Sequence, residues 1–452
     1  MTGARFGPFA LAPGVLPTNM AALLFGAFAT IGLVTAVAVL TPYLLSQTLG
    51  IAEERQGRAL GGLAVLNELV LIAAYGPLGA LADRIGRRVI YAAGFAAMAA
   101  AYLLFPFAGS IEGFGLVRAL YALGAGAATG MYATLIADYV REGDRGKLAG
   151  IGGMLNGLGI VALALGLGAL PAALGRAGFD PQAAARLTCA VAAAMCLAVA
   201  LALWAGLRRD RPDAGGPARP GLAAQLREGL AVARRDPEVA LACAAAFVAR
   251  GDLVIVGLFT IAWGKLAATQ AGMAPAEAIE AGRLPFVVAQ GAALLWPIAI
   301  LWFVDRLPRV AVLGWSMALG ALGYLAMRMV GDPLGTAAIP WFALLGVGQI
   351  SAVLGAQTLI GKAAPEASRG AVIGLFNFCG ALGILLLSGL GGWAFDHWGP
   401  ASPFLIVGAL NGLVALAAIP VARHAARRAP LAVSAAAGGA PVSIGVREPP
   451  PA

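Results

Sequence analysis

Four charged residues stand inside long apolar runs of the sequence: Glu68, Arg118, Arg250 and Asp252. They can be considered as two pairs of opposite charge, Glu68 with Arg118 and Arg250 with Asp252. Inserting an ionisable residue into a membrane costs at least about 2.5–3.5 kcal/mol of free energy unless the residue is paired or hydrated. Ionisable residues in membrane spans are therefore rare and usually functional. A carboxylate in such surroundings is a candidate proton carrier, and a guanidinium is a candidate ligand for an anion. Asp252 and Arg250 are therefore our first candidates for proton and substrate binding, and a structural charge network is the alternative.

The spacing of these charges limits how they can pair. Arg250 and Asp252 stand at i and i+2 and therefore point to different sides of a helix. Glu68 and Arg118 both fall in the outer halves of their runs, so we expect either a coupling site or a structural bridge between them. Neutral polar residues that could complete a pathway are Gln290, Gln349 and Asn377.

The composition indicates that membrane-spanning segments hold these residues. Of the 452 residues, 60% are hydrophobic and only 12% are charged, which is roughly half the charge of a soluble domain. This excludes a soluble enzyme and a disordered chain. The net charge of +9 comes from scattered basic residues that form no stripe, so a nucleic-acid-binding surface is not expected. The chain is predicted to be a multi-spanning membrane protein.

Apolar runs of about 20 residues, enough to cross a bilayer as helices, occur twelve times. They lie at 20–46, 59–82, 89–109, 113–139, 147–173, 185–207, 238–264, 284–304, 310–330, 336–360, 370–394 and 401–423. We expect an all-α membrane protein with an N-terminal six-helix bundle at 20–207 and a C-terminal one at 238–423. The flanking parts are a cytoplasmic segment at 1–19, a central cytoplasmic loop at 208–237 and a disordered tail at 424–452.

Basic residues between the runs predict the orientation. Most of the 31 Lys and Arg fall in segments on the same side as both termini, and cytoplasmic loops carry such an excess. The central loop could hold an amphipathic helix with Leu222, Leu226 and Leu230 on one face, or be a solvated linker. We expect a multi-pass protein of the bacterial inner membrane, monomeric, with both termini in the cytoplasm.

The two halves repeat each other. The loop after the fourth run contains Glu142 three residues before Arg145, and the loop after the tenth contains Glu366 three residues before Arg369. In both loops a glycine follows the arginine. The Asp-Arg pair at 83–84 recurs at 305–306. A duplicated six-helix unit explains these matches, and transporters built this way bind substrate between the halves.

The segment GALADRIGRR at 79–88 resembles the G-x-L-x-D-R-x-G-R-R/K loop of the major facilitator superfamily. Its residues are Gly79, Asp83, Arg84, Gly86, Arg87 and Arg88. The resemblance implies two parallel six-helix bundles across about residues 20–423. It also implies an inner gate in which Asp83 meets the start of the eleventh span near Gly370 and Arg87 and Arg88 pair with Asp138. The repeated loops around Glu142, Arg145, Glu366 and Arg369 would belong to this gate, unless these charges only fix topology.

These features predict a secondary active transporter that works by alternating access, moves a small polar or anionic molecule and is coupled to protons. No nucleotide-binding loop of the G-x-x-x-x-G-K-[ST] type and no HExxH motif occurs, so neither an enzyme nor a cofactor or metal site is expected. The four cysteines fall in apolar runs as packing residues. The alternatives are an ion-independent uniporter and a sensor or scaffold that has lost transport.

Overall fold

The computed structural model describes residues 5–141, 144–209, 222–304, 307–365 and 368–437. Twelve helices in this part are long and apolar enough to cross a membrane, as the sequence predicts. They are α1 (Pro17–Leu49), α2 (Gln56–Ile85), α3 (Arg87–Leu104), α4 (Ile111–Tyr139), α5 (Arg145–Arg176), α6 (Pro181–Gly206), α8 (Pro237–Gln270), α10 (Leu284–Val304), α11 (Arg309–Leu325), α12 (Ile339–Ala363), α13 (Arg369–Trp398) and α14 (Ser402–Ala437). The remaining elements are β1 (Arg5–Phe6), β2 (Phe9–Ala10), η1 (Glu53–Arg55), η2 (Phe105–Phe107), α7 (Leu222–Arg235), α9 (Pro275–Gly282), η4 (Ala326–Met329) and η5 (Thr336–Ala338).

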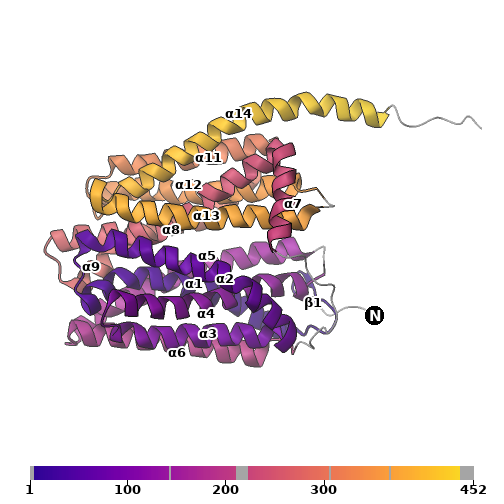
Figure 1. Ribbon diagram of the computed structural model, residues 1–452. Coiled ribbons are helices and arrows are strands. Elements are labelled where there is room, and N and C mark those ends of the chain that lie inside the picture. The colour runs from indigo at the N-terminus through magenta and orange to yellow at the C-terminus, as the bar shows by residue number, and fades with distance from the viewer. Residues whose placement is uncertain (1–4, 142–143, 210–221, 305–306, 366–367, 438–452) are drawn as a thin grey trace, which may run out of the picture.

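Figure 1 shows these helices as two stacked groups, with α1 to α6 in one half and α8 to α14 in the other.

Capping residues and prolines in the local sequence determine where helices begin. The Asp180 carboxylate accepts hydrogen bonds from the Gln182 and Ala183 amides at 3.0 Å, and proline occupies the first turn of α6. Both features suit a helix N-terminus, where amides lack intrahelical partners and proline has no N–H to lose.

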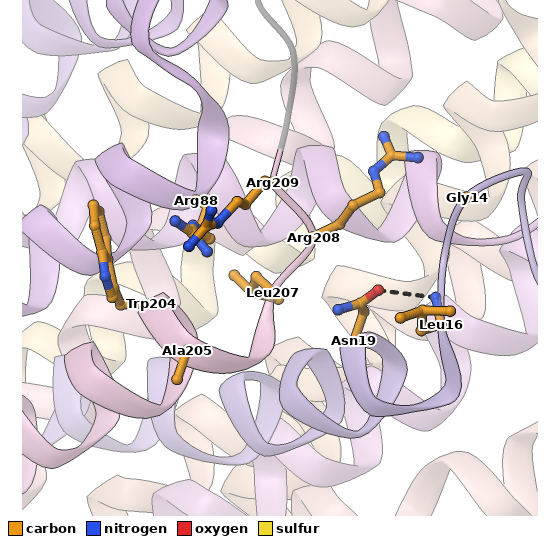
Figure 2. Close-up of a pocket in the computed structure, with 9 residues that line it drawn as sticks. All are labelled: Gly14, Leu16, Asn19, Arg88, Trp204, Ala205, Leu207, Arg208 and Arg209. Atoms are coloured by element: carbon orange, nitrogen blue, oxygen red, sulfur yellow. Dashed lines mark hydrogen bonds between the residues drawn. The ribbon is translucent and has the colours of Figure 1, made fainter.

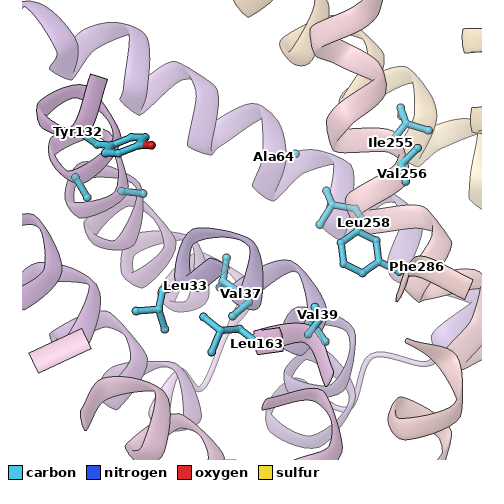
Figure 3. Close-up of a cluster of buried hydrophobic side chains, with 14 of the residues drawn as sticks. Leu33, Val37, Val39, Ala64, Tyr132, Leu163, Ile255, Val256, Leu258 and Phe286 are labelled. Carbon is cyan, nitrogen blue, oxygen red and sulfur yellow. The ribbon is translucent and has the colours of Figure 1, made fainter. Parts of the chain in front are cut away.

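Small residues bring helices of the two halves close together. Gly57 and Gly61 of α2 face Gly392 and Ser388 of α13, and a Cβ on either α2 glycine would collide with the α13 backbone. Such contacts replace the hydrophobic drive that lipid cannot supply between helices. Buried apolar side chains continue this contact inside, from Val39 of α1 to Leu258 of α8 and Phe286 of α10 (Figure 3).

The first residues form a structured strap, which we define as residues 5–16. A two-stranded hairpin pairs Phe6 with Phe9, and Leu11 forms a bridge with Val140 at the end of α4. Phe9 and Leu11 are buried. We call the end of the bundle that carries the strap the strap end, and the opposite end, with η1 and α9, the far end (Figure 1). The sequence predicts a segment at 1–19 but not this fold, because two-residue strands leave no periodic pattern.

Two other boundary predictions change. α14 continues as a helix to Ala437 and extends past its neighbours (Figure 1), so the expectation of a disordered tail is corrected for residues 424–437. This stretch is rich in alanine, which has the highest helix propensity.

The central loop contains α7, and Gly229 of this helix packs on Ala371 of α13. The amphipathic helix is confirmed, and one side of it lies against the C-terminal half.

Asp144 should hold the strap in place. Its carboxylate accepts a hydrogen bond from the Ala10 amide at 2.8 Å and pairs with Lys147 at 2.7 Å. The Ala10 amide, then Lys147, lowers the pKa of Asp144. The strap is therefore stabilised at neutral pH, and this contribution is lost as pH falls through the lowered pKa. Asp144→Ala should accelerate hydrogen exchange of residues 5–16 at pH 7.

Lys147→Met is the matched control, because it removes the ion pair and keeps the Ala10 hydrogen bond. It should change the exchange rate of the strap less than Asp144→Ala does. Equal exchange in wild type and Asp144→Ala would mean that the buried Phe9 and Leu11 hold the strap without the carboxylate.

Candidate functional site

A polar group lies where α2 of one half faces α8 and α13 of the other. Arg250 donates a hydrogen bond through Nη1 to Oδ1 of Asn377 at 2.9 Å. A Cβ at Gly380 would collide with the Arg250 side chain, so this glycine leaves the arginine room to lie along α13. Two residues that the sequence singled out from separate helices are thus in contact.

Glu68 completes this group from the N-terminal half. Its side chain is 6% exposed and lies within Coulombic range of Arg250, without a hydrogen bond or salt bridge between these two described side chains. The expected pair of Glu68 with Arg118 does not form. Arg118 lies 5.3 Å from the centroid of the Tyr121 ring, and its Nε and Nη1 have no hydrogen-bond partner. We call Glu68, Arg250 and Asn377 the interhalf polar group.

Asp252 lies apart from this group. Its side chain is 0% exposed and lies beside Tyr324 of α11. The Tyr324 hydroxyl of α11 donates to the backbone oxygen of Asp252 at 3.3 Å. The i, i+2 spacing therefore has the effect predicted from the sequence: Arg250 faces α13, and Asp252 is buried within the C-terminal half near α11.

The two glutamines form a second contact inside the C-terminal half. Nε2 of Gln290 on α10 donates to Oε1 of Gln349 on α12 at 3.3 Å. Six residues further along α10, Nε1 of Trp296 donates to Oγ of Ser351 at 2.8 Å. These bonds join α10 to α12, so the glutamines hold the helices of this half together rather than meeting the interhalf polar group.

The motif at 79–88 is formed in part at the strap end. Gly86 has φ 98°, a conformation that favours glycine, and it turns the chain from α2 into α3. Arg87 forms the predicted salt bridge with Asp138 at the end of α4. Arg88 does not join it, because its guanidinium lies 4.6 Å from the centroid of the Trp204 ring of α6.

The predicted contact of Asp83 with the start of α13 is not formed among the described residues. Asp83 and Arg84 are exposed, and the space around Gly79 and Gly370 is free. Arg145 begins α5, and Arg369 donates to the Gly361 carbonyl at 3.1 Å, at the end of α12. The predicted roles of Glu142 and Glu366, and of the pair at 305–306, fall outside the described residues.

The far end, in contrast, is closed by polar contacts between the halves. Asp396 of α13 accepts hydrogen bonds from the amides of Gly57 and Arg58 at 2.8 Å, at the start of α2. Arg176 of α5 pairs with Glu280 of α9 at 2.9 Å. The described residues therefore hold the halves together at the far end, while Asp83 makes no such link at the strap end.

Lys265 is the residue that sequence reasoning missed. It is 0% exposed in α8, and its Nζ lies 2.9 Å from Glu53 of η1 and 2.7 Å from both the Pro42 carbonyl and Ser46 Oγ of α1. Lys265 comes directly after the seventh predicted run, 238–264, where a basic residue is typical of a loop charge. The signal was present, since the apolar residues Leu266, Ala267 and Ala268 follow it and continue the run.

Comparison with known proteins agrees with this architecture. The family model described as Major Facilitator Superfamily matches residues 23–296 and 281–448. Among solved structures, the nucleoside transporter NupG superposes with a TM-score of 0.68 at 14% identity, covering 90% of this chain and 99% of that one. The D-xylose-proton symporter superposes with a TM-score of 0.64 at 17% identity, covering 89% and 96%.

Three curated proteins are more similar in sequence. Magnetosome protein MamZ of Magnetospirillum gryphiswaldense is 30% identical over 86% of this chain, and MamZ of Paramagnetospirillum magneticum is 31% identical over 83%. The match spans about 60% of the length of each MamZ protein. Magnetosome protein MamH of the latter organism is 27% identical over 87% of this chain and 90% of its own length. With its duplicated bundles, its loop at 79–88 and these matches, the chain belongs to the major facilitator superfamily of membrane transporters.

Proposed function

We propose that the chain is a secondary transporter that moves a small polar or anionic molecule by alternating access. The observation that carries this proposal is the interhalf polar group, in which Arg250, hydrogen-bonded to Asn377 in one half, lies within Coulombic range of the buried Glu68 of the other half. Transporters of this architecture bind substrate near the midplane between their halves. A site whose ligands come from both halves changes its access as the halves rock.

Arg250 is the proposed substrate ligand. Its planar guanidinium can bind a carboxylate or phosphate through two hydrogen bonds, and Asn377 fixes its direction. Asn377 also offers an amide to a polar substrate. An anionic group is therefore the best chemical match, with Glu68 as the group that competes with it for Arg250.

Glu68 is the proposed coupling residue, and Asp252 takes second place. This reverses the order favoured by the sequence, because Glu68 lies within Coulombic range of Arg250, whereas Asp252 is buried inside the C-terminal half beside Tyr324. A proton on Glu68 removes its negative charge and leaves Arg250 to the anion. The anion and the proton would then cross the membrane together, which is how an ion gradient would drive transport.

The contacts at the two ends support alternating access. The far end is joined through Asp396, Glu280 and Lys265, whereas Asp83 at the strap end is exposed. We propose that the strap end faces the cytoplasm, so that this conformation is open inward. In the outward-open state the far-end contacts would break, and Asp83 would meet the start of α13.

The proposed location is the bacterial inner membrane, with both termini cytoplasmic and the chain acting as a monomer. Because the relatives MamZ and MamH are named magnetosome proteins, the magnetosome membrane is a second proposed location. Fractionation of cells that carry a tagged chain separates the two.

The test of function compares metabolites inside cells and in the medium for wild type, Glu68→Gln and Asp252→Asn at matched expression. We expect a compound that moves with wild type, keeps moving with Asp252→Asn and loses its response to an imposed pH gradient with Glu68→Gln. The direction of movement distinguishes import from export.

The outcomes assign the coupling residue. If Asp252→Asn alone loses the response to the pH gradient, the proton role belongs to Asp252. If wild type transports without any response to pH, the chain is a uniporter. If no compound differs from cells that lack the protein, the transporter proposal fails and a sensor or scaffold role replaces it.

A further inference from the structure

A cavity of about 360 Å³ lies at the strap end, where the strap, the start of α3 and the end of α6 meet. Its lining includes Leu16, Arg88, Trp204, Arg208 and Arg209 (Figure 2). The cavity is separate from the interhalf polar group, since all its lining residues belong to the N-terminal half and the segment that follows α6. Three arginines in one cavity of this size suggest a binding site for an anion.

The three arginines differ in how far the protein already uses them. Arg208 donates from Nη1 to the Pro13 carbonyl at 3.0 Å and from its amide to the Tyr139 hydroxyl at 3.0 Å, so it fixes the strap against α4. Arg88 lies over Trp204 and Arg209 is exposed. Within the described residues, neither Arg88 nor Arg209 forms a salt bridge with a carboxylate. Two guanidinium groups are therefore available to one ligand.

The surroundings of the cavity show what kind of anion fits. Trp204 is 47% exposed, and Leu201, one turn earlier on α6, is 68% exposed. Tryptophan is enriched where a membrane meets water, with its ring at the level of the lipid headgroups. An exposed apolar helix surface thus leads directly to the arginines, as a lipid with an apolar tail and an anionic head requires.

We propose that this cavity binds the phosphate headgroup of an acidic phospholipid. Arg88 and Arg209 contact the phosphate, Trp204 lies beside the headgroup, and the acyl chains lie along Leu201. Basic residues near a membrane surface attract anionic lipids, and guanidinium groups bind phosphate through paired hydrogen bonds. A bound lipid would link the strap, α3 and α6, and the proposal is independent of the transported substrate.

The test uses the purified full chain in neutral detergent with added phosphatidylglycerol, phosphatidylcholine or inorganic phosphate, and counts retained lipid by native mass spectrometry. We expect retention of phosphatidylglycerol over phosphatidylcholine. Arg88→Gln and Arg209→Gln should each reduce this preference about fivefold, as expected for the loss of one basic contact at a membrane surface. Arg209→Lys should keep most of it.

Arg328→Gln is the matched control, because Arg328 is an exposed arginine at the far end. It should leave the preference unchanged. Equal retention of the two lipids, or an equal loss in Arg328→Gln, overturns the proposal. Release of phosphatidylglycerol by millimolar inorganic phosphate, with phosphate bound in its place, overturns the lipid as ligand and assigns the cavity to a soluble phosphate.

Discussion

Arg250→Gln should reduce transport of an anionic substrate about a hundredfold or more, with normal expression and folding. Removing one member of a desolvated, hydrogen-bonded charge pair costs about 2–5 kcal/mol, and each 1.4 kcal/mol is a factor of ten. Glutamine keeps most of the side-chain length and can still bond Asn377. The loss therefore reports the charge that the substrate needs, and initial rates of substrate movement in vesicles measure it.

Two comparison variants locate this effect. Asn377→Ala leaves the charge and removes only the group that orients it, so its loss should be about tenfold, the value of one hydrogen bond to a charged group. Arg118→Gln changes an arginine that also stands within a membrane-spanning helix but lies over Tyr121 within one half. Its effect on the apparent affinity for substrate should be much smaller. An equal loss in Arg118→Gln would contradict the assignment of Arg250 as the ligand.

The fold was predictable from the sequence because its signal is strong and repeated. Twelve apolar runs of bilayer length define the spans, and the predicted limits differ from the helix ends by a few residues, apart from α14. The duplication and the motif at 79–88 supplied the arrangement of the two halves. The strap was not predictable, since its hairpin depends on contacts such as Ala10 with Asp144, 134 residues away.

The site was predictable in its residue types and less so in its pairing. Apolar surroundings identify Glu68, Arg118 and Arg250 as unusual, but they do not state which helix each side chain faces. Proximity of the second and fourth spans suggested Glu68 with Arg118. The close glycine packing of α2 on α13 instead places Glu68 near Arg250. Such a contact between halves depends on the conformation of the whole protein, which local spacing does not encode.

Lys265 is a second residue whose contacts could not be predicted from the local sequence. A basic residue just after an apolar run is typical of a loop charge that fixes topology. Its role becomes clear only when the ends of α1 and α8 are placed together, where Glu53, Pro42 and Ser46 surround its ammonium group. This group links the two halves at the far end, so its charge balance should set how firmly that end stays closed.

Glu53→Gln should therefore open the far end. The substitution removes the negative charge beside the buried Lys265 ammonium and leaves it neutral acceptors alone: the glutamine amide oxygen, the Pro42 carbonyl and the Ser46 hydroxyl. Removing one partner of a buried ion pair costs about 3–5 kcal/mol, and this cost falls on the closed state alone if the opened far end admits water to Lys265. A difference of this size is enough to invert the populations of two states that differ by a few kcal/mol.

The measurement is a distance distribution between spin labels at Gln182 and Met273, two exposed positions at the far end that belong to different halves. In lipid nanodiscs, wild type should give a short distance and Glu53→Gln a longer one. The double variant Glu53→Gln with Lys265→Met removes both charges and should restore most of the short distance, because no uncompensated charge remains. A short distance in all three proteins would show that Asp396 and the glycine contacts between α2 and α13 close the far end without the ion pair.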